Sequence, residues 1–254
     1  MRRSGTPGRA ALPSAPVTIL ATVTAAAAML AAVSASSGAA ATVRARPAVQ
    51  PAHVLAILFD EHVARSAPDT GASVVQVVKA RRPITGVRTV LPVLGRRSPN
   101  GVGWLRVRLP GRPNGGTGWI ERRATRIVHT SWHVVVDTSE RRVTVYKQGR
   151  PVRAFRAVVG KPGTPTPHGK FFVEEAVQLR ARDVGAPFAL ALSARSNVLQ
   201  EFDGGPGQIA LHGRMNIGGV LGSAASHGCL RLDDDAMRWL VVRIGAGVPI
   251  TITH

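Results

Sequence analysis

The stretch SHGCLRL at residues 226–232 decides how this sequence is interpreted, because it contains the single cysteine of the chain, Cys229. A second stretch, IALHG at residues 209–213, places His212 seventeen residues before that cysteine. A thiol reacts as its thiolate, so a nucleophilic cysteine needs an imidazole or oriented N–H dipoles nearby. Together the two stretches predict a reactive cysteine with a histidine base, and not a cysteine that packs as a small hydrophobe.

Two histidines compete for the role of base. His227 lies two residues before Cys229, and residues i and i+2 of a strand share a face, although a tight turn at Gly228 can aim them apart. His212 must instead be brought to the cysteine by the fold. Gly228 allows the backbone to approach a substrate closely, and the N–H groups of Gly228 and Cys229 are candidate donors to a developing oxyanion.

This constellation resembles the YkuD-type L,D-transpeptidase family over roughly residues 131–253. The matching residues are Gly160-Lys161, Thr166-Pro167-His168-Gly169, Phe171, His212-Gly213 and SHGCLRL at 226–232. The resemblance implies a β-rich catalytic domain and a cysteine acyl-enzyme mechanism that uses neither a metal nor another cofactor. It also implies peptidoglycan stem peptides as the substrate class.

The resemblance assigns roles to individual residues. It makes Cys229 the nucleophile, His212 the base and His227 a second active-site imidazole. Ser226 and Gly228 would shape the cysteine loop. Two further residues, Arg231 and Gly213, would meet the substrate. His168 lies in a turn near the motif, and a place beside the cleft is only the minor option for it.

In this interpretation Cys229 attacks a tetrapeptide stem, releases the terminal D-alanine and holds the stem as a thioester. An amine of a second stem then resolves the thioester into a cross-link, whereas water as the acceptor would give L,D-carboxypeptidase activity. Four other interpretations stay open at this point: a metal site built from His212, His227 and Cys229, a papain-like peptidase, a sortase, and a non-catalytic cell-wall-binding protein.

The first 43 residues predict export. Three arginines at positions 2, 3 and 9 precede an apolar run at 16–33, and small residues follow at 34–41. This order is typical of a secretory signal peptide, with cleavage near residues 39–41 favoured over retention as an N-terminal anchor. We expect the protein in the cell wall or periplasmic space, with membrane contact only through this segment if it stays uncleaved.

The charge of the chain suggests a class of partner. Lysine and arginine number 33 against 14 aspartates and glutamates, so the formal net charge is +19. Residues 70–125 hold eleven of these basic residues and one acid, Glu121. An exported chain does not normally meet nucleic acid, so we expect acidic cell-wall polymers as the polyanion. High salt should weaken such binding, and binding that resists salt would contradict this expectation.

The pattern along the chain predicts the domain organisation. Residues 44–69 have linker composition, with a short helix as one option for the apolar patch at 53–59. Short β-rich runs separated by Gly/Pro turns predict a small basic β domain at 70–126. Its Gly103-Trp104-Leu105 and Gly118-Trp119-Ile120 segments resemble the strands of a bacterial Src-homology-three-like barrel.

The catalytic domain is predicted over residues 130–254. Alternating and continuous apolar runs at 132–160 predict two or three strands joined by turns at 137–140 and 148–151. The run Asp233-Asp234-Asp235 predicts the start of a helix over 236–242, and 248–253 predicts a final strand. We therefore predict a mostly β protein in which a small β-barrel-like module precedes a β-rich catalytic domain with a short helix after the cysteine loop.

Overall fold

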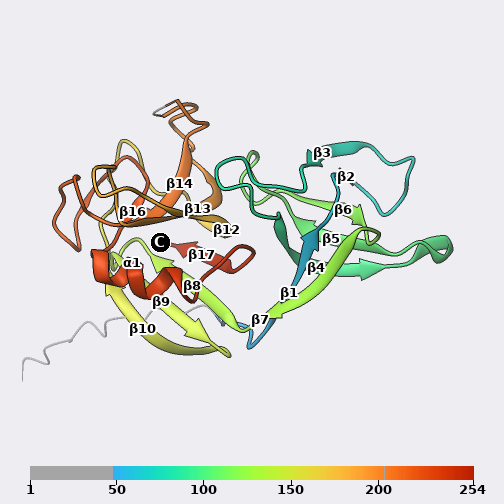
Figure 1. The fold of residues 1–254 in the computed structure, drawn as a ribbon, viewed down its shortest axis with the longest axis horizontal. Coiled ribbons are helices and arrows are strands. Elements are labelled where there is room, and N and C mark those ends of the chain that lie inside the picture. Colours follow the sequence, from blue (N-terminus) through green and yellow to red (C-terminus); the bar gives the residue numbers. More distant parts are fainter. Residues whose placement is uncertain (1–47, 203) are drawn as a thin grey trace, which may run out of the picture. The chain divides into compact units, whose positions relative to one another are not determined.

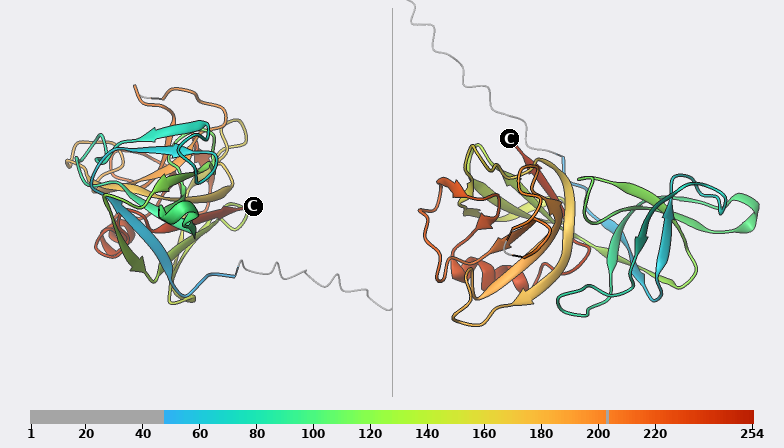
Figure 2. Two further views of the ribbon diagram at one scale, coloured as in Figure 1. Left: turned by 90° about the vertical axis from the view of Figure 1, so that its right-hand side faces the viewer. Right: turned by 90° about the horizontal axis from the view of Figure 1, so that it is seen from above.

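The computed structural model describes residues 48–202 and 204–254, so the predicted signal segment 1–43 lies outside the described residues. Within this part of the chain the fold is mostly β, as predicted, with one short α-helix after the cysteine loop (Figure 1). None of the described helices has the length and apolarity needed to span a bilayer. The strands up to Thr130 form one group, and those from Trp132 onward form another (Figure 2).

The first group is a seven-stranded sheet with the order β3-β2-β6-β5-β4-β1-β7. Its strands are β1 (His53–Leu58), β2 (His62–Arg65), β3 (Val74–Val78), β4 (Val90–Arg97), β5 (Trp104–Arg108), β6 (Thr117–Glu121) and β7 (Thr125–Thr130), and a 3-10 turn, Pro99–Gly101, joins β4 to β5. The runs that predicted strands between residues 73 and 123 correspond to β3, β4, β5 and β6. That the sheet closes into a barrel, and that it binds acidic polymers, stay predictions.

The structure corrects the expected linker over 44–69 and the helix at 53–59. Both β1 and β2 lie in this segment, and β1 pairs antiparallel with β4 and with β7. A short apolar run fits a strand as well as a helix, so its partners decide which forms. Here Ala56 and Leu58 of β1 are fully buried in the core of the first sheet.

The second group is an eight-stranded sheet with the order β10-β9-β8-β17-β12-β13-β14-β16. Its strands are β8 (Trp132–Asp137), β9 (Arg142–Lys147), β10 (Arg150–Arg156), β12 (Gly169–Gln178), β13 (Phe188–Arg195), β14 (Gln208–His212), β16 (Leu230–Arg231) and β17 (Pro249–Thr253). A separate parallel pair joins β11 (Val159–Gly160) to β15 (Ala224–Ser226). Most neighbours in the large sheet are antiparallel, but β17 runs parallel to β8 and β16 runs parallel to β14.

Local chemistry explains where these elements turn and start. The β9–β10 turn has two residues with positive φ, Gln148 at 52° and Gly149 at 74°, which is the conformation of a tight two-residue hairpin. Helix α1 (Asp234–Val241) begins where the side chain of Asp233 accepts the backbone N–H of Asp235. Asp234 and Asp235 lie in the first turn, where their negative charges interact favourably with the positive end of the helix dipole.

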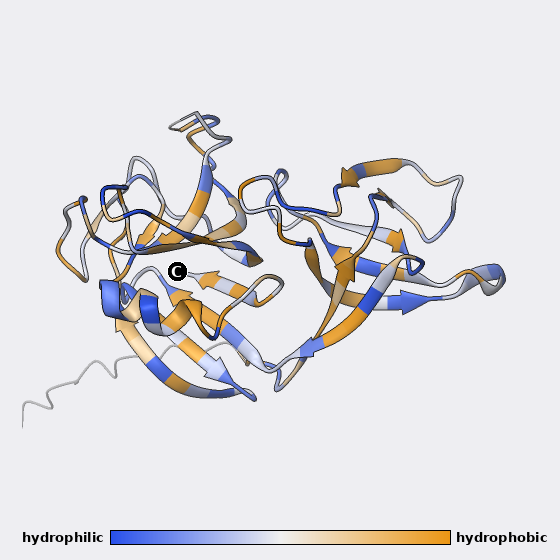
Figure 3. Ribbon diagram, in the orientation of Figure 1, coloured by the Kyte–Doolittle hydropathy of each residue, from blue (hydrophilic) through white to orange (hydrophobic). Residues whose placement is uncertain are grey.

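Strand β12 belongs to both hydrophobic cores. Successive side chains of a strand point to opposite faces. Accordingly Phe171 packs in the core of the second sheet, while Phe172 packs in the core of the first. Figure 3 shows hydrophobic stretches along the strands of both groups. The two sheets therefore share a hydrophobic contact through one strand.

A buried ionic cluster lies at the same strand. Glu174 of β12 has a fully buried side chain, and its carboxylate pairs with Arg82 from the β3–β4 connection. The other carboxylate oxygen lies 3.1 Å from Nη2 of Arg195, at the end of β13. Removing one member of a buried ion pair leaves an uncompensated charge in a poorly solvated place.

Glu174→Gln should therefore lower the free energy of unfolding by about 3–5 kcal/mol, because both arginines lose their counter-charge. Urea unfolding of the two proteins measures the difference. The matched control is Glu140→Gln, which removes an exposed pair with Arg142 at 3.4 Å and should cost less than about 1 kcal/mol. Equal losses in the two variants would contradict a structural role for the buried cluster.

Candidate active site

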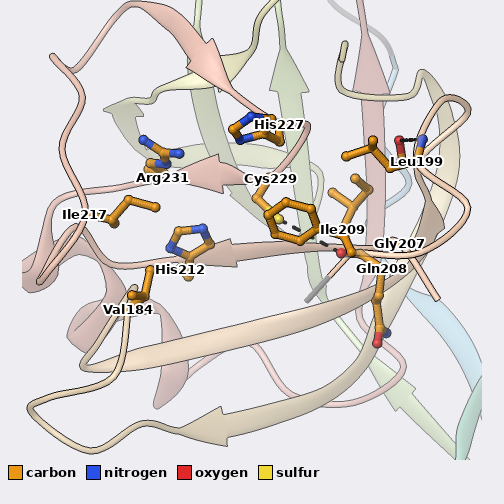
Figure 4. Close-up of a pocket in the computed structure, with 12 residues that line it drawn as sticks. Val184, Leu199, Gly207, Gln208, Ile209, His212, Ile217, His227, Cys229 and Arg231 are labelled. Atoms are coloured by element: carbon orange, nitrogen blue, oxygen red, sulfur yellow. Dashed lines mark hydrogen bonds between the residues drawn. The ribbon is translucent and has the colours of Figure 1, made fainter. Parts of the chain in front are cut away.

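A cavity of about 430 Å³ opens beside the cysteine loop (Figure 4). Four of the residues predicted for the site line it: Cys229, His212, His227 and Arg231. The other three, Ser226, Gly228 and Gly213, are buried and do not line it. Its remaining walls are mainly apolar and come from Val184, Ser196, Leu199, Phe202, Gly207, Gln208, Ile209 and Ile217.

Parallel pairing of β14 with β16 brings the histidine to the cysteine. Leu211 pairs with Leu230, and His212 pairs with Arg231. Paired residues lie side by side in a sheet, and residues i and i+2 share a face. Cys229, two residues before Arg231, therefore lies diagonally across from His212 on the same face, and Figure 4 shows both side chains at the cavity.

The hydrogen bonding of His212 determines which ring nitrogen is available. Nδ1 lies 2.8 Å from the carbonyl oxygen of Gly213, so Nδ1–H donates to that oxygen. Nε2 is then the unprotonated nitrogen. Burial lowers the pKa of His212 below its ordinary value, and the charge of Arg231 lowers it further, against an opposing effect of the bond to Gly213. A neutral imidazole with a basic Nε2 results.

Two glycines fix the position of this imidazole. A Cβ on Gly213 would lie 2.0 Å from the carbonyl oxygen of Ala186, so only glycine fits there. The expected substrate contact of Gly213 stays a prediction. Gly185, at φ +83°, packs against the ring, and a Cβ there would lie 2.5 Å from Nδ1 of His212. Sequence analysis did not single out Gly185.

The thiol of Cys229 is half-buried at the cavity. Its Sγ lies 3.9 Å from the carbonyl oxygen of Gln208, the dashed contact in Figure 4. Burial raises the pKa of this thiol, while a backbone hydrogen bond from Ala210 and the charge of Arg231 act in the opposite direction. The sulfur is therefore protonated at neutral pH and needs a base to become a nucleophile.

The cysteine loop is held by the side chain of Ser226. Its Oγ donates to the carbonyl oxygen of Cys229 at 2.6 Å and accepts the N–H of Gly228 at 3.1 Å. Gly228 has φ +119°, a conformation that other residues rarely adopt. The sequence predicted two donors to an oxyanion, the backbone N–H groups of Gly228 and Cys229. In the structure, the Gly228 N–H already donates to Oγ of Ser226. Among residues 48–202 and 204–254, no group accepts a hydrogen bond from the Cys229 N–H.

The turn between β11 and β12 forms hydrogen bonds with the backbone of the cysteine loop. The hydroxyl of Thr166 donates to the carbonyl oxygen of Gly228 at 2.8 Å and accepts the N–H of Gly160 at 3.0 Å. The Lys161 N–H donates to the carbonyl oxygen of Ser226 at 2.9 Å. His168 is exposed, does not line the cavity and contacts Thr138.

His227 and Arg231 lie on the other sides of the cavity. His227 is exposed, with Nε2 3.4 Å from the Lys161 ammonium, and its ring stacks on Phe202 with 5.7 Å between centroids. Arg231 is buried, and its Nη1 donates to the carbonyl oxygen of Gly218 at 2.7 Å. His212, and not His227, therefore has the buried and oriented imidazole expected of a base.

The apolar walls of the cavity were missed by sequence reasoning. Val184, Leu199, Phe202 and Ile217 come from three irregular segments, and no periodic pattern marks them. Within the described ranges, no group of three or more His, Cys, Asp or Glu side chains is arranged to hold a metal ion.

Comparison with known proteins finds similarity to L,D-transpeptidases. Residues 131–252 match the family model described as YkuD, the L,D-transpeptidase catalytic domain. L,D-transpeptidase 1 of Mycobacterium tuberculosis is 28% identical over 130 residues, which are 46% of this chain and 49% of that protein. The chain thus spans about half the length of the curated relatives that it matches.

Solved structures of L,D-transpeptidases match part of the chain at low identity. The L,D-transpeptidase from Mycobacterium smegmatis is 21% identical with a TM-score of 0.37, covering 60% of this chain and 91% of that one. A variant of the Enterococcus faecium L,D-transpeptidase is 20% identical with a TM-score of 0.37, covering 48% and 49% of the two chains. Residues 131–252, just under half of this chain, are thus similar to the YkuD family of L,D-transpeptidase catalytic domains.

Proposed function

We propose that this chain is a cysteine-dependent L,D-transpeptidase that cross-links tetrapeptide stems of peptidoglycan. The observation that carries the proposal is that Cys229 and His212 line the same cavity, with Nδ1 of His212 held by the carbonyl oxygen of Gly213. An imidazole whose Nδ1–H is already bonded presents Nε2 to accept a proton, as a general base requires.

The first half-reaction forms the thioester. Nε2 of His212 takes the proton of the Cys229 thiol as the sulfur attacks the stem carbonyl. The N–H of Cys229 is the proposed donor to the oxyanion that develops on the carbonyl oxygen. The C–N bond to the terminal D-alanine then breaks, and the imidazolium returns the proton to the leaving amine. An S–C bond to the stem remains.

The second half-reaction releases the enzyme. The amine of an acceptor stem attacks the thioester carbonyl and loses a proton to Nε2 of His212. The S–C bond breaks, an amide cross-link forms, and the proton returns to Cys229 as a thiol. Water as the acceptor would give a carboxylic acid instead, which is the carboxypeptidase alternative.

The walls of the cavity suit a stem peptide that carries carboxylates. Leu199, Phe202 and Ile217 offer apolar contact, while Arg231 and the Lys161 ammonium beside His227 supply positive charge. A basic mouth raises the local concentration of an anionic substrate. Peptidoglycan stems lie outside the cytoplasmic membrane, so this proposal requires the export that the N-terminal segment predicts.

The direct test is incubation of the full chain with disaccharide-tetrapeptide. The wild-type protein should release D-alanine and form a cross-linked dimer, and Cys229→Ala should form neither because no thioester can form. Mass spectrometry and chromatography of the products measure both. A folded wild-type protein that binds cell walls but yields no product would favour the non-catalytic wall-binding alternative.

The pH dependence identifies the base. Because burial lowers the pKa of His212 below 6.5, its neutral form persists below pH 6.5 and is lost as the pH falls further. The acidic limb of kcat/KM for D-alanine release should therefore have its midpoint below pH 6.5. Rates measured between pH 4.5 and 8 locate this midpoint. A midpoint at or above pH 6.5 would contradict the assignment of the buried imidazole as the base.

Ser226→Ala tests how far catalysis depends on the shape of the cysteine loop. The change leaves the Gly228 N–H and the Cys229 carbonyl without their shared partner, and kcat/KM should fall roughly 10- to 100-fold. The matched control is Ser139→Ala, since Ser139 bonds Asp137 in an exposed turn and its loss should leave kcat/KM unchanged. An unaffected Ser226→Ala enzyme would show that the loop keeps its shape without the serine.

A further inference from the structure

One wall of the active-site cavity is an irregular segment between β13 and β14, here called the wall loop, described at residues 196–202 and 204–207. Ser196, Leu199, Phe202 and Gly207 of this loop line the cavity. Figure 4 shows Leu199 and Gly207 at the edge of the cavity beside Gln208. Within the loop, the Ser196 N–H donates to the carbonyl oxygen of Gly207 at 2.8 Å, and Phe202 forms a backbone bridge with Gly205. In the described residues the named sheets include no strand from the loop, so contacts from outside it help to fix its position.

A single arginine of the first sheet region supplies such contacts. Arg112, in the connection between β5 and β6, donates through Nη2 to the carbonyl oxygens of Ser196 at 2.8 Å and Leu199 at 3.0 Å. Its Nη1 donates to the carbonyl oxygen of Pro206 at 2.8 Å. The planar guanidinium thus joins the two ends of the wall loop, which suits its fixed set of donors.

A neighbouring side chain fixes the point where the loop begins. Asn114 accepts the N–H of Arg195 at 2.8 Å and donates to the carbonyl oxygen of the same residue at 2.7 Å. Arg195 is the last residue of β13, directly before the wall loop. The β5–β6 connection therefore contacts the wall loop at two places. Asn114 binds the residue before its start, and Arg112 binds carbonyl oxygens near both of its ends.

We propose that Arg112 is a positioning residue for the reaction, which holds the wall loop so that Leu199 and Phe202 contact the donor stem. This inference rests on the proposed transpeptidase function and gives the first sheet region a part in substrate binding. Arg112 does not line the active-site cavity itself. It therefore acts on the affinity for the stem and leaves the chemistry at Cys229 and His212 intact.

Arg112→Ala tests the proposal through a split between KM and kcat. Loss of three hydrogen bonds from a charged donor frees the loop, so KM for disaccharide-tetrapeptide should rise about tenfold or more, while kcat stays within about threefold. Arg112→Lys should be intermediate, because one ammonium cannot reach both ends of the loop as two nitrogens do. Arg97→Ala is the control, since Arg97 is exposed and, in the described chain, the hydrogen bond of its side chain goes to the carbonyl oxygen of its neighbour Arg96.

Hydrogen exchange of the wall-loop amides separates this proposal from the proposed function. Amides at 197–202 should exchange faster in Arg112→Ala than in the wild type and in Arg97→Ala, whether or not the protein turns over stems. Unchanged exchange, or a fall in kcat with KM unaltered, would overturn the positioning role. A wild-type protein without activity but with the expected exchange difference would overturn the transpeptidase function and leave the contact of Arg112 with the loop in place.

Discussion

The parallel contact between β14 and β16 is the constraint on which the proposed chemistry depends. Two residue pairs, Leu211 with Leu230 and His212 with Arg231, place the imidazole and the thiol on one face. The sequence separates these groups by seventeen residues, so only the sheet register can join them. A shift of one residue would turn His212 to the opposite face, away from the cavity. The buried Leu211 and Leu230 oppose such a shift, because they would have to leave the core.

Burial sets the protonation state of the pair as well as its geometry. A low dielectric disfavours charged forms, which raises the pKa of a thiol and lowers the pKa of an imidazole. Both effects act here, on Cys229 and on His212, so the resting site holds a neutral pair. In the proposed mechanism, proton transfer from Cys229 to His212 accompanies attack on a bound carbonyl. The hydrogen bonds of Ser226 and Thr166 maintain the loop in which this occurs.

Sequence analysis located the candidate site residues better than it described the cavity around them. SHGCLRL and IALHG carry residue types that a nucleophilic cysteine requires, and the structure brings Cys229 and His212 to one cavity. The tight packing of Gly213 against Ala186 was not predicted, because it shows only in three dimensions. Strand β1 was missed because a six-residue apolar run has no period that separates helix from strand. The wall loop was missed because its contacts with Arg112 span more than eighty residues and leave no local pattern.

The most direct test of this account is intact-protein mass spectrometry of the chain after exposure to a carbapenem, with Cys229→Ala and His212→Asn beside the wild type. A thiol activated by the buried imidazole should give one covalent adduct on the wild-type protein, none on Cys229→Ala, and strongly slowed acylation of His212→Asn at pH 7. An adduct that forms as fast on His212→Asn as on the wild type, or no adduct on the folded wild-type protein, would contradict the assignment of Cys229 and His212 as the reacting pair.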